Sequence, residues 1–144
     1  MIGFAPFNKP VAKLFLGDVG SLPIGLLMGW CLLHLAGKGH LVAALLLPLY
    51  YLADATITLL RRLIKGEAIW IAHRSHFYQQ ATGNGFSVAQ VVSEIFILNI
   101  VLAALAAFSI WLTSPYVEGM TLAAGAGAVA LVLSRFSRER KSLA

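Results

Sequence analysis

Four long apolar stretches constrain the fold of this chain more than any other feature of its sequence. They cover residues 21–36, 40–60, 88–112 and 117–136. A helix needs about 20 mostly apolar residues to cross the hydrocarbon core of a bilayer, within a range of about 17–25. The last three stretches are long enough, and the first is too if its helix begins near Val19 and runs through Gly37.

The sequence therefore predicts an all-α, polytopic membrane protein with about four transmembrane helices. The expected spans are about 20–37, 41–61, 89–112 and 117–135, within a single membrane domain of residues 1–144. A loop of about residues 62–88 separates the second span from the third, and a basic tail follows at 136–144. Turn signals made of glycine, proline and serine bound the stretches.

The composition supports this class. Hydrophobic residues make up 59% of the chain and charged residues 12%, whereas soluble domains average about 45–50% and about 25%. These values argue against a soluble globular enzyme and against a disordered tail. The single cysteine, Cys31, lies inside an apolar stretch, which argues against a disulfide-stapled secreted scaffold.

The distribution of positive charge predicts the topology. With a cytoplasmic N-terminus, four spans place residues 1–19, the central loop and the tail on one side. Ten of the 11 Lys and Arg residues fall on that side, and Lys38 falls on the other. They are Lys9, Lys13, Arg61, Arg62, Lys65, Arg74, Arg135, Arg138, Arg140 and Lys141. The positive-inside rule then places both termini and the loop in the cytoplasm, in a multi-pass protein of the inner (plasma) membrane.

The same distribution argues against two other roles for the basic residues. Nucleic-acid binding would need cations clustered with aromatic platforms on a polar surface, whereas here they lie in short groups beside apolar stretches. The N-terminal segment shows no small-residue cleavage pattern after its first apolar residues, so we expect no removable signal peptide. The predicted surroundings are membrane lipid, with no nucleic acid.

Two features of the third and fourth spans concern packing. Gly119, Ala123 and Gly127 are four residues apart and would let a second helix backbone approach closely, unless they belong to an ordinary alanine-rich span. Glu94 and Asn99 are polar groups within the third span, and each is expected to face protein instead of lipid.

The first polar cluster lies at the start of the first span, in the sequence Gly17-Asp18-Val19-Gly20-Ser21. A carboxylate at a helix N-terminus is favoured by the helix dipole. Asp18 could hold a hard cation such as Mg²⁺, which takes one or two protein carboxylates and completes its shell with phosphate and water. The alternative is that Asp18 or Ser21 only caps the helix.

The second polar cluster lies on the second span. Residues at intervals of three and four share one helix face, and here they are Tyr50, Tyr51, Asp54, Thr58, Arg61, Arg62 and Lys65. Asp54 lies about two turns inside the membrane boundary, where an ionisable group normally faces the bundle interior or a wet cavity. We expect Arg61 or Arg62 as its neighbour, through Thr58 or water. The alternative is a purely structural polar link between helices.

The third polar cluster lies in the loop, at His73, Arg74 and His76, with Phe77 and Tyr78 beside it. Two histidines without a third ligand are weak evidence for zinc. Arginine can bind phosphate oxygens through two parallel hydrogen bonds, and aromatic rings can stack on a base. The cluster therefore favours a nucleotide diphosphate, and the alternative is an interfacial segment anchored by its aromatic residues.

Taken in order, residues 15–23, 54–62 and 73–79 resemble motifs of one known family. They are similar to the C-terminal part of the polyprenyl-phosphate N-acetylhexosamine-1-phosphate transferase superfamily, glycosyltransferase family 4. The resemblance covers about residues 3–100, and the last span fits by hydropathy alone.

The resemblance implies an integral membrane enzyme that transfers a sugar 1-phosphate from a UDP-sugar to undecaprenyl phosphate. It implies Mg²⁺ at Asp18, the family's metal-associated aspartate, and catalytic roles for Asp18, His73 and His76. It further implies that substrate is bound by Arg74, Ser21, Arg61, Arg62 and Asp54. Phosphoryl transfer depends chiefly on positioning and charge neutralisation, which suits these residue types.

The sequence departs from the family in two ways. Arg74 and Ser75 interrupt a run of consecutive histidines, which favours the N-acetylhexosamine type. The family's paired-aspartate motif and its Asn- and Asp-rich nucleotide loop lie upstream of anything present here. We therefore expect a C-terminal part, a truncated reading frame or half of a split enzyme, inactive without the N-terminal half or another membrane subunit. The alternative is a non-catalytic membrane remnant or assembly subunit of that family.

Overall fold

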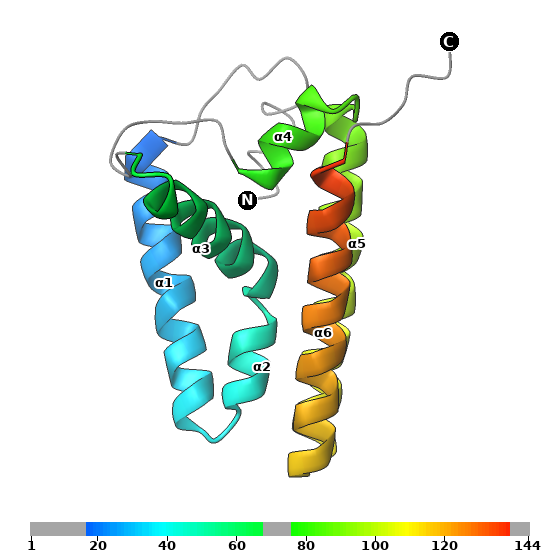
Figure 1. Cartoon of the computed structure of the whole chain (residues 1–144). Coiled ribbons are helices and arrows are strands. Elements are labelled where there is room, and N and C mark those ends of the chain that lie inside the picture. The colour runs from blue at the N-terminus through cyan, green and yellow to red at the C-terminus, as the bar shows by residue number, and fades with distance from the viewer. Residues whose placement is uncertain (1–16, 68–75, 139–144) are drawn as a thin grey trace. The chain divides into compact units, whose positions relative to one another are not determined.

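A computed structural model describes residues 17–67 and 76–138, and this part of the chain is entirely helical. It contains α1 (Gly17–Gly37), α2 (Leu41–Leu46), α3 (Leu49–Ile64), α4 (Phe77–Gly83), α5 (Val88–Trp111) and α6 (Pro115–Phe136), as Figure 1 shows. The all-α prediction is confirmed for these residues. The chain divides into two units, Met1–His34 and Leu35–Ala144, so the boundary falls inside α1.

Three of the helices are long and apolar enough to cross a membrane. They are α1 with 21 residues, α5 with 24 and α6 with 22. They occupy the first, third and fourth of the expected spans. The start of α6 at Pro115 follows the expected serine–proline turn signal. Proline suits the first turn because its missing N–H has no partner there. Helix α5 begins after a capping box formed by Ser87 and Gln90, which was not predicted from the sequence.

The prediction of one unbroken helix over residues 41–61 was wrong. This stretch forms two helices, α2 and α3, separated by Leu47 and Pro48. Proline lacks the N–H that would continue the helix, and its ring clashes with the carbonyl four residues earlier. The Leu52 N–H donates to the Pro48 carbonyl at 3.0 Å, so a new helix starts directly after the break and runs on into the expected loop.

The core of the second unit lies where α2, α5 and α6 meet. Helices α5 and α6 lie side by side along their length (Figure 1), and α2 packs against both. Leu46 and Leu102 are completely buried there. The buried residues of α6 are Thr121, Gly125, Val129, Leu133 and Phe136.

The small residue that α6 uses for close packing is Gly125. A Cβ added to Gly125 would lie 2.5 Å from Leu46 Cδ2 and 3.2 Å from Leu102 Cδ2. The row of Gly119, Ala123 and Gly127 is exposed, so its predicted contact with a second helix is not made among the described residues and stays a prediction. Small residues allow close approach only on the face that meets a neighbour.

This packing gives a first testable prediction. Gly125→Ala is expected to destabilise the second unit by about 1–3 kcal/mol, the usual cost of forcing an extra group into a well-packed core. Gly127→Ala, two residues along the same helix, has nothing within 4 Å of its added Cβ and serves as the control. Thermal unfolding in detergent checks both variants. Equal melting temperatures for the two would contradict the assigned packing face.

Candidate functional site

Helix α3 is polar on its buried side and apolar on its exposed side. Its buried residues are Tyr50, Asp54, Thr58 and Arg62, spaced by four. Its exposed apolar residues are Leu52, Leu59, Leu60, Leu63 and Ile64. This is the reverse of a helix on the surface of a water-soluble protein, and it suits a helix that meets lipid outside and a polar interior inside. The predicted polar face is confirmed only for the four buried residues, because Tyr51, Arg61 and Lys65 are exposed.

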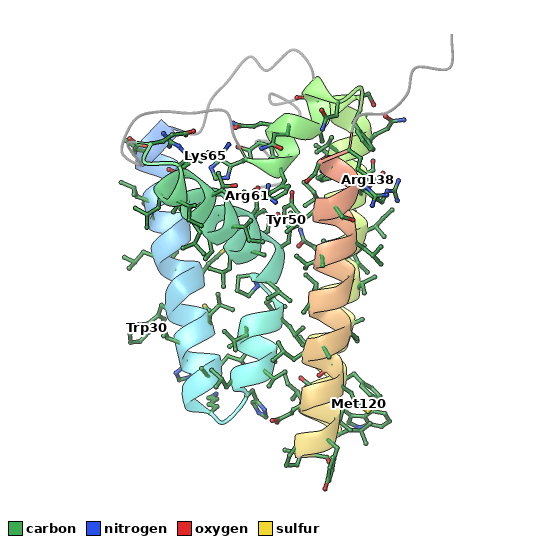
Figure 2. The ribbon with its side chains drawn as sticks, viewed as in Figure 1. Trp30, Tyr50, Arg61, Lys65, Met120 and Arg138 are labelled. Atoms are coloured by element: carbon green, nitrogen blue, oxygen red, sulfur yellow. The ribbon has the colours of Figure 1, made fainter. Side chains whose placement is uncertain are left out.

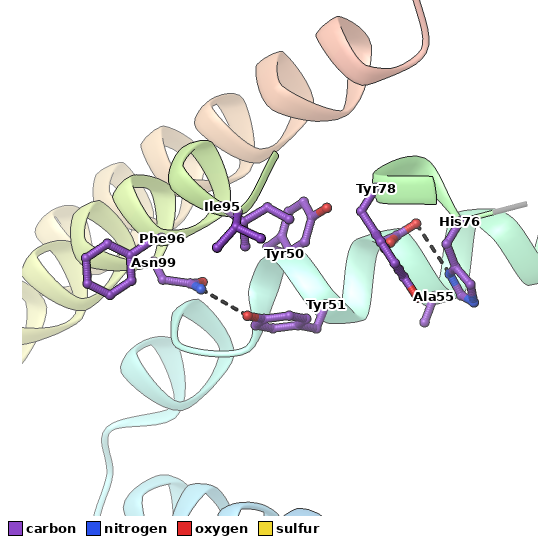
Figure 3. Close-up of a pocket in the computed structure, with 10 residues that line it drawn as sticks. Tyr50, Tyr51, Ala55, His76, Tyr78, Ile95, Phe96 and Asn99 are labelled. Atoms are coloured by element: carbon purple, nitrogen blue, oxygen red, sulfur yellow. Dashed lines mark hydrogen bonds and ion pairs between the residues drawn. The ribbon is translucent and has the colours of Figure 1, made fainter. Parts of the chain in front are cut away.

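Asp54 joins α3 to α4. Its residue is 4% exposed, and its Oδ1 accepts hydrogen bonds from the Phe77 N–H at 2.9 Å and from Thr58 Oγ1 at 3.3 Å. His76 Nδ1 lies 3.5 Å from the same oxygen, a contact dashed in Figure 3. The expectation of Arg61 or Arg62 as the neighbour was wrong, although Thr58 was correctly placed in the contact.

A cavity of about 460 Å³ opens beside this junction. Figure 3 shows residues of α3, α4 and α5 around it, and the lining comprises Tyr50, Tyr51, Asp54, Ala55, His76, Tyr78, Val92, Ile95, Phe96 and Asn99. Asn99 Nδ2 donates to the Tyr51 hydroxyl at 3.1 Å. Among the described residues, the buried Tyr50 hydroxyl and Asn99 Oδ1 have no hydrogen-bond partner. An aromatic cavity with a few convergent polar groups is typical of a ligand site.

A second, more polar cavity of about 230 Å³ lies at the end of α3. Its lining comprises Thr58, Arg61, Arg62, Lys65, Glu67 and Gln80. The Arg61 guanidinium lies 4.7 Å from the centre of the Phe77 ring, a cation–π contact. Arg62 Nε donates to Glu67 Oε2 at 3.1 Å. Gly66, with a φ of +69°, ends the helix and turns Glu67 back towards Arg62.

Among the described residues of the second unit, Arg61, Lys65 and Arg138 lie at one end of it, whereas Lys38 lies in the turn between α1 and α2. Figure 2 labels Arg61 and Lys65 in the last turns of α3 and Arg138 just after α6, whereas Met120 lies at the opposite end of α6. This is the distribution that the positive-inside expectation requires of these residues. The orientation of the chain in a membrane stays a prediction.

Asp18 and Ser21 lie in the first unit, in the first two turns of α1. Both residues are exposed. Within residues 17–67 and 76–138, no group of three or more His, Cys, Asp or Glu side chains is placed to hold a metal ion. His73 and Arg74 lie outside the described residues, so the implied joint role of Asp18, His73 and His76 in catalysis stays a prediction.

Glu94 and Asn99 both face protein, as expected. Glu94 Oε1 accepts from Arg135 Nη2 at 3.0 Å, which joins α5 to α6. Besides the contacts of Asp54 with α4, sequence reasoning also missed a hydrogen bond in which Asn84 Nδ2 donates to the Phe136 carbonyl at 2.7 Å. The signal was weak, because Asn84 lies in a Gly-Asn-Gly sequence that reads as an ordinary turn.

Comparison with known proteins gives a consistent result. Residues 1–36 match the family model described as "Glycosyl transferase family 4". The chain is 33% identical over 105 residues to the phospho-N-acetylmuramoyl-pentapeptide-transferase of Bartonella quintana (strain Toulouse). It is 27% identical over 122 residues to a Bacillus subtilis (strain 168) protein named as a probable undecaprenyl-phosphate N-acetylglucosaminyl 1-phosphate transferase.

These similarities cover much of this chain but a minor part of each relative. The first covers 71% of the chain and 28% of the Bartonella protein. The second covers 78% of the chain and 34% of the Bacillus protein. No solved structure matches the chain.

Proposed function

This chain is a relative of glycosyl transferase family 4, and from this we propose that it forms part of a membrane sugar-1-phosphate transferase. In the proposed reaction, an oxygen of undecaprenyl phosphate attacks the phosphorus that carries the sugar of a UDP-sugar. The bond from that phosphorus to UMP breaks. The products are UMP and a lipid-linked diphosphate sugar, with a sugar of the N-acetylhexosamine type.

The similarity to known proteins carries this proposal more than any feature of the structure. The family match over residues 1–36 includes Asp18 and Ser21, and similarity to two named transferases extends over most of the chain. The Asp54–His76 junction supports it, because it joins a polar helix face to the histidine-bearing segment beside a cavity. A membrane location is supported by the three long apolar helices, and we propose the inner membrane with both termini cytoplasmic.

The residues present fit a role in holding Mg²⁺. Asp18 offers an exposed carboxylate at the start of α1, and Mg²⁺ needs only one or two protein carboxylates beside phosphate oxygens and water. Asp18 would therefore supply one ligand. When bound, Mg²⁺ would neutralise negative charge on the transferred phosphoryl group.

The other residues would bind and orient the substrates. We assign His73, Arg74 and His76 to the diphosphate, and Ser21 to the neighbourhood of the metal. Arg61 is better placed than Arg62 to contact an anion, because Arg62 is buried and bonded to Glu67 whereas Arg61 is exposed.

Reconstitution tests the proposal. This chain would be co-expressed with the part of the Bacillus subtilis relative that lies outside their similarity. Membranes would then receive UDP-N-acetylglucosamine, undecaprenyl phosphate and Mg²⁺, and UMP release would be measured. We expect no release from either part alone and release from both together, lost with a chelator and restored by Mg²⁺.

The intact Bacillus relative is the positive control in this assay. If the two parts co-purify but release no UMP while the control is active, the transferase proposal is wrong for this chain. That result would favour a non-catalytic remnant or assembly subunit, a candidate suggested by the small share of each relative that the chain covers.

A further inference from the structure

We propose that Asp54 is a positioning residue that acts through His76 and does not itself contact substrate. This inference rests on the proposed function, since it gives Asp54 a role in the same transfer. It also replaces the sequence-based assignment of Asp54 to substrate binding.

The first step concerns the start of α4. His76 is the N-cap of this helix, with extended backbone (φ −65°, ψ 147°), and its side chain makes no capping bond. The first N–H groups of a helix lack partners within the helix and need an acceptor from outside. Asp54 supplies it, because its Oδ1 accepts from the Phe77 N–H at 2.9 Å across 23 residues of sequence. The carboxylate thereby fixes where α4 begins.

The second step concerns the imidazole. His76 Nδ1 lies 3.5 Å from the same Asp54 oxygen, and the His76 side chain is 26% exposed. Its ring stacks on Tyr78 with centroids 5.8 Å apart and planes 20° apart. A carboxylate facing Nδ1 favours a proton on that nitrogen, which leaves the lone pair of the neutral ring on Nε2. Asp54 and Tyr78 together set the orientation and tautomer of the ring at the edge of the 460 Å³ cavity.

The third step concerns Asp54 itself. Its residue is 4% exposed, and its Oδ1 faces the Phe77 N–H, the Thr58 hydroxyl and the His76 ring. A buried carboxylate oxygen that already accepts two protein hydrogen bonds and lies beside an imidazole is poorly suited to bind substrate. It is well suited to orient a neighbouring side chain that binds substrate, as buried carboxylates orient histidines in other enzymes.

The experiment compares Asp54→Asn with Asp54→Ala, each alone and with His76→Ala, in the reconstituted transferase. Asparagine keeps an acceptor for the Phe77 N–H but loses the charge that holds the imidazole. We expect Asp54→Asn to lower turnover by about 10- to 100-fold, the range for losing a partner that orients a functional histidine. In the His76→Ala background the same substitution should cause no further loss, because residues acting as a unit are not additive. Ser109→Ala, at a buried polar residue of α5, is the control.

A second measurement does not need activity. In the full chain in nanodiscs, ¹⁵N NMR should show the His76 proton on Nδ1 and its loss from Nδ1 in Asp54→Ala. Exchange of the Phe77 amide should become faster by about tenfold or more in Asp54→Ala, the loss expected for one buried hydrogen bond. It should stay slow in Asp54→Asn.

The outcomes separate this inference from the proposed function. If the wild-type pair is inactive, the transferase proposal fails, and the NMR measurement still decides whether Asp54 positions His76. An unchanged His76 tautomer in Asp54→Ala would overturn the inference. The inference would also be overturned if Asp54→Asn lowered turnover in the His76→Ala background by the same factor as in the wild type. Asp54 would then act on turnover without His76.

Discussion

Replacing Asp18 with asparagine is expected to lower turnover of the reconstituted transferase by about 10²–10³-fold, the usual cost of losing one group that stabilises transition-state charge. Asparagine has nearly the same shape as aspartate but carries no negative charge to hold Mg²⁺. Asp18 is exposed in the first turn of α1, so its loss should leave the helix intact. UMP release measured across a range of Mg²⁺ concentrations checks the prediction, and excess Mg²⁺ should restore part of the activity.

Glu118→Gln is the matched control for this change. Glu118 also lies in the first turn of a long helix, α6, so the substitution removes the same charge from a similar position. We expect full turnover from this variant. Unchanged activity in Asp18→Asn would disprove the metal assignment, and an equal loss in both variants would point to a general effect of charge.

The long helices could be predicted from apolar length alone. A backbone in lipid must satisfy its hydrogen bonds internally, which makes an apolar stretch of sufficient length a helix. This argument succeeded for α1, α5 and α6. It failed at Pro48, where the missing proline N–H coincides with a break between α2 and α3. Because α1 runs unbroken through Pro23, a proline within an apolar stretch does not by itself tell where a helix ends.

Only the residues of the site that lie on one helix could be predicted from the sequence, because spacing along the chain relates residues within a helix. Spacing by four placed Asp54 and Thr58 on one buried face of α3. The partner of Asp54 depends on where α4 lies, and Phe77 is 23 residues further along the chain. No local pattern links positions so far apart.

The packing face of α6 shows a similar limit. Small residues occur on several rows between Gly119 and Ala130, and each row is compatible with close helix packing. The choice of the row containing Gly125 is made by Leu46 and Leu102, which lie on other helices. Sequence alone gives the candidates, and tertiary contacts select among them.

The end of α6 gives the prediction with the largest expected effect on stability. Phe136 is completely buried, and its ring lies edge-to-face with Phe86 at a centroid distance of 5.7 Å. Its carbonyl accepts the 2.7 Å hydrogen bond from Asn84. Phe136→Ala would leave a cavity between α6 and the α4–α5 connection, so we expect the free energy of unfolding to fall by about 3–5 kcal/mol.

Thermal unfolding in detergent measures this loss, with Tyr116→Ala as the control, because Tyr116 is an aromatic residue of the same helix that is 85% exposed. Because Phe136 and Asn84 hold the segment directly after α4, the amides of α4 should also lose protection from hydrogen exchange in Phe136→Ala. The middle of α5, packed on α2 and α6, should keep its protection. Equal melting temperatures for the two variants, or loosening of α5 without α4, would show that Phe136 does not secure the helix that His76 begins.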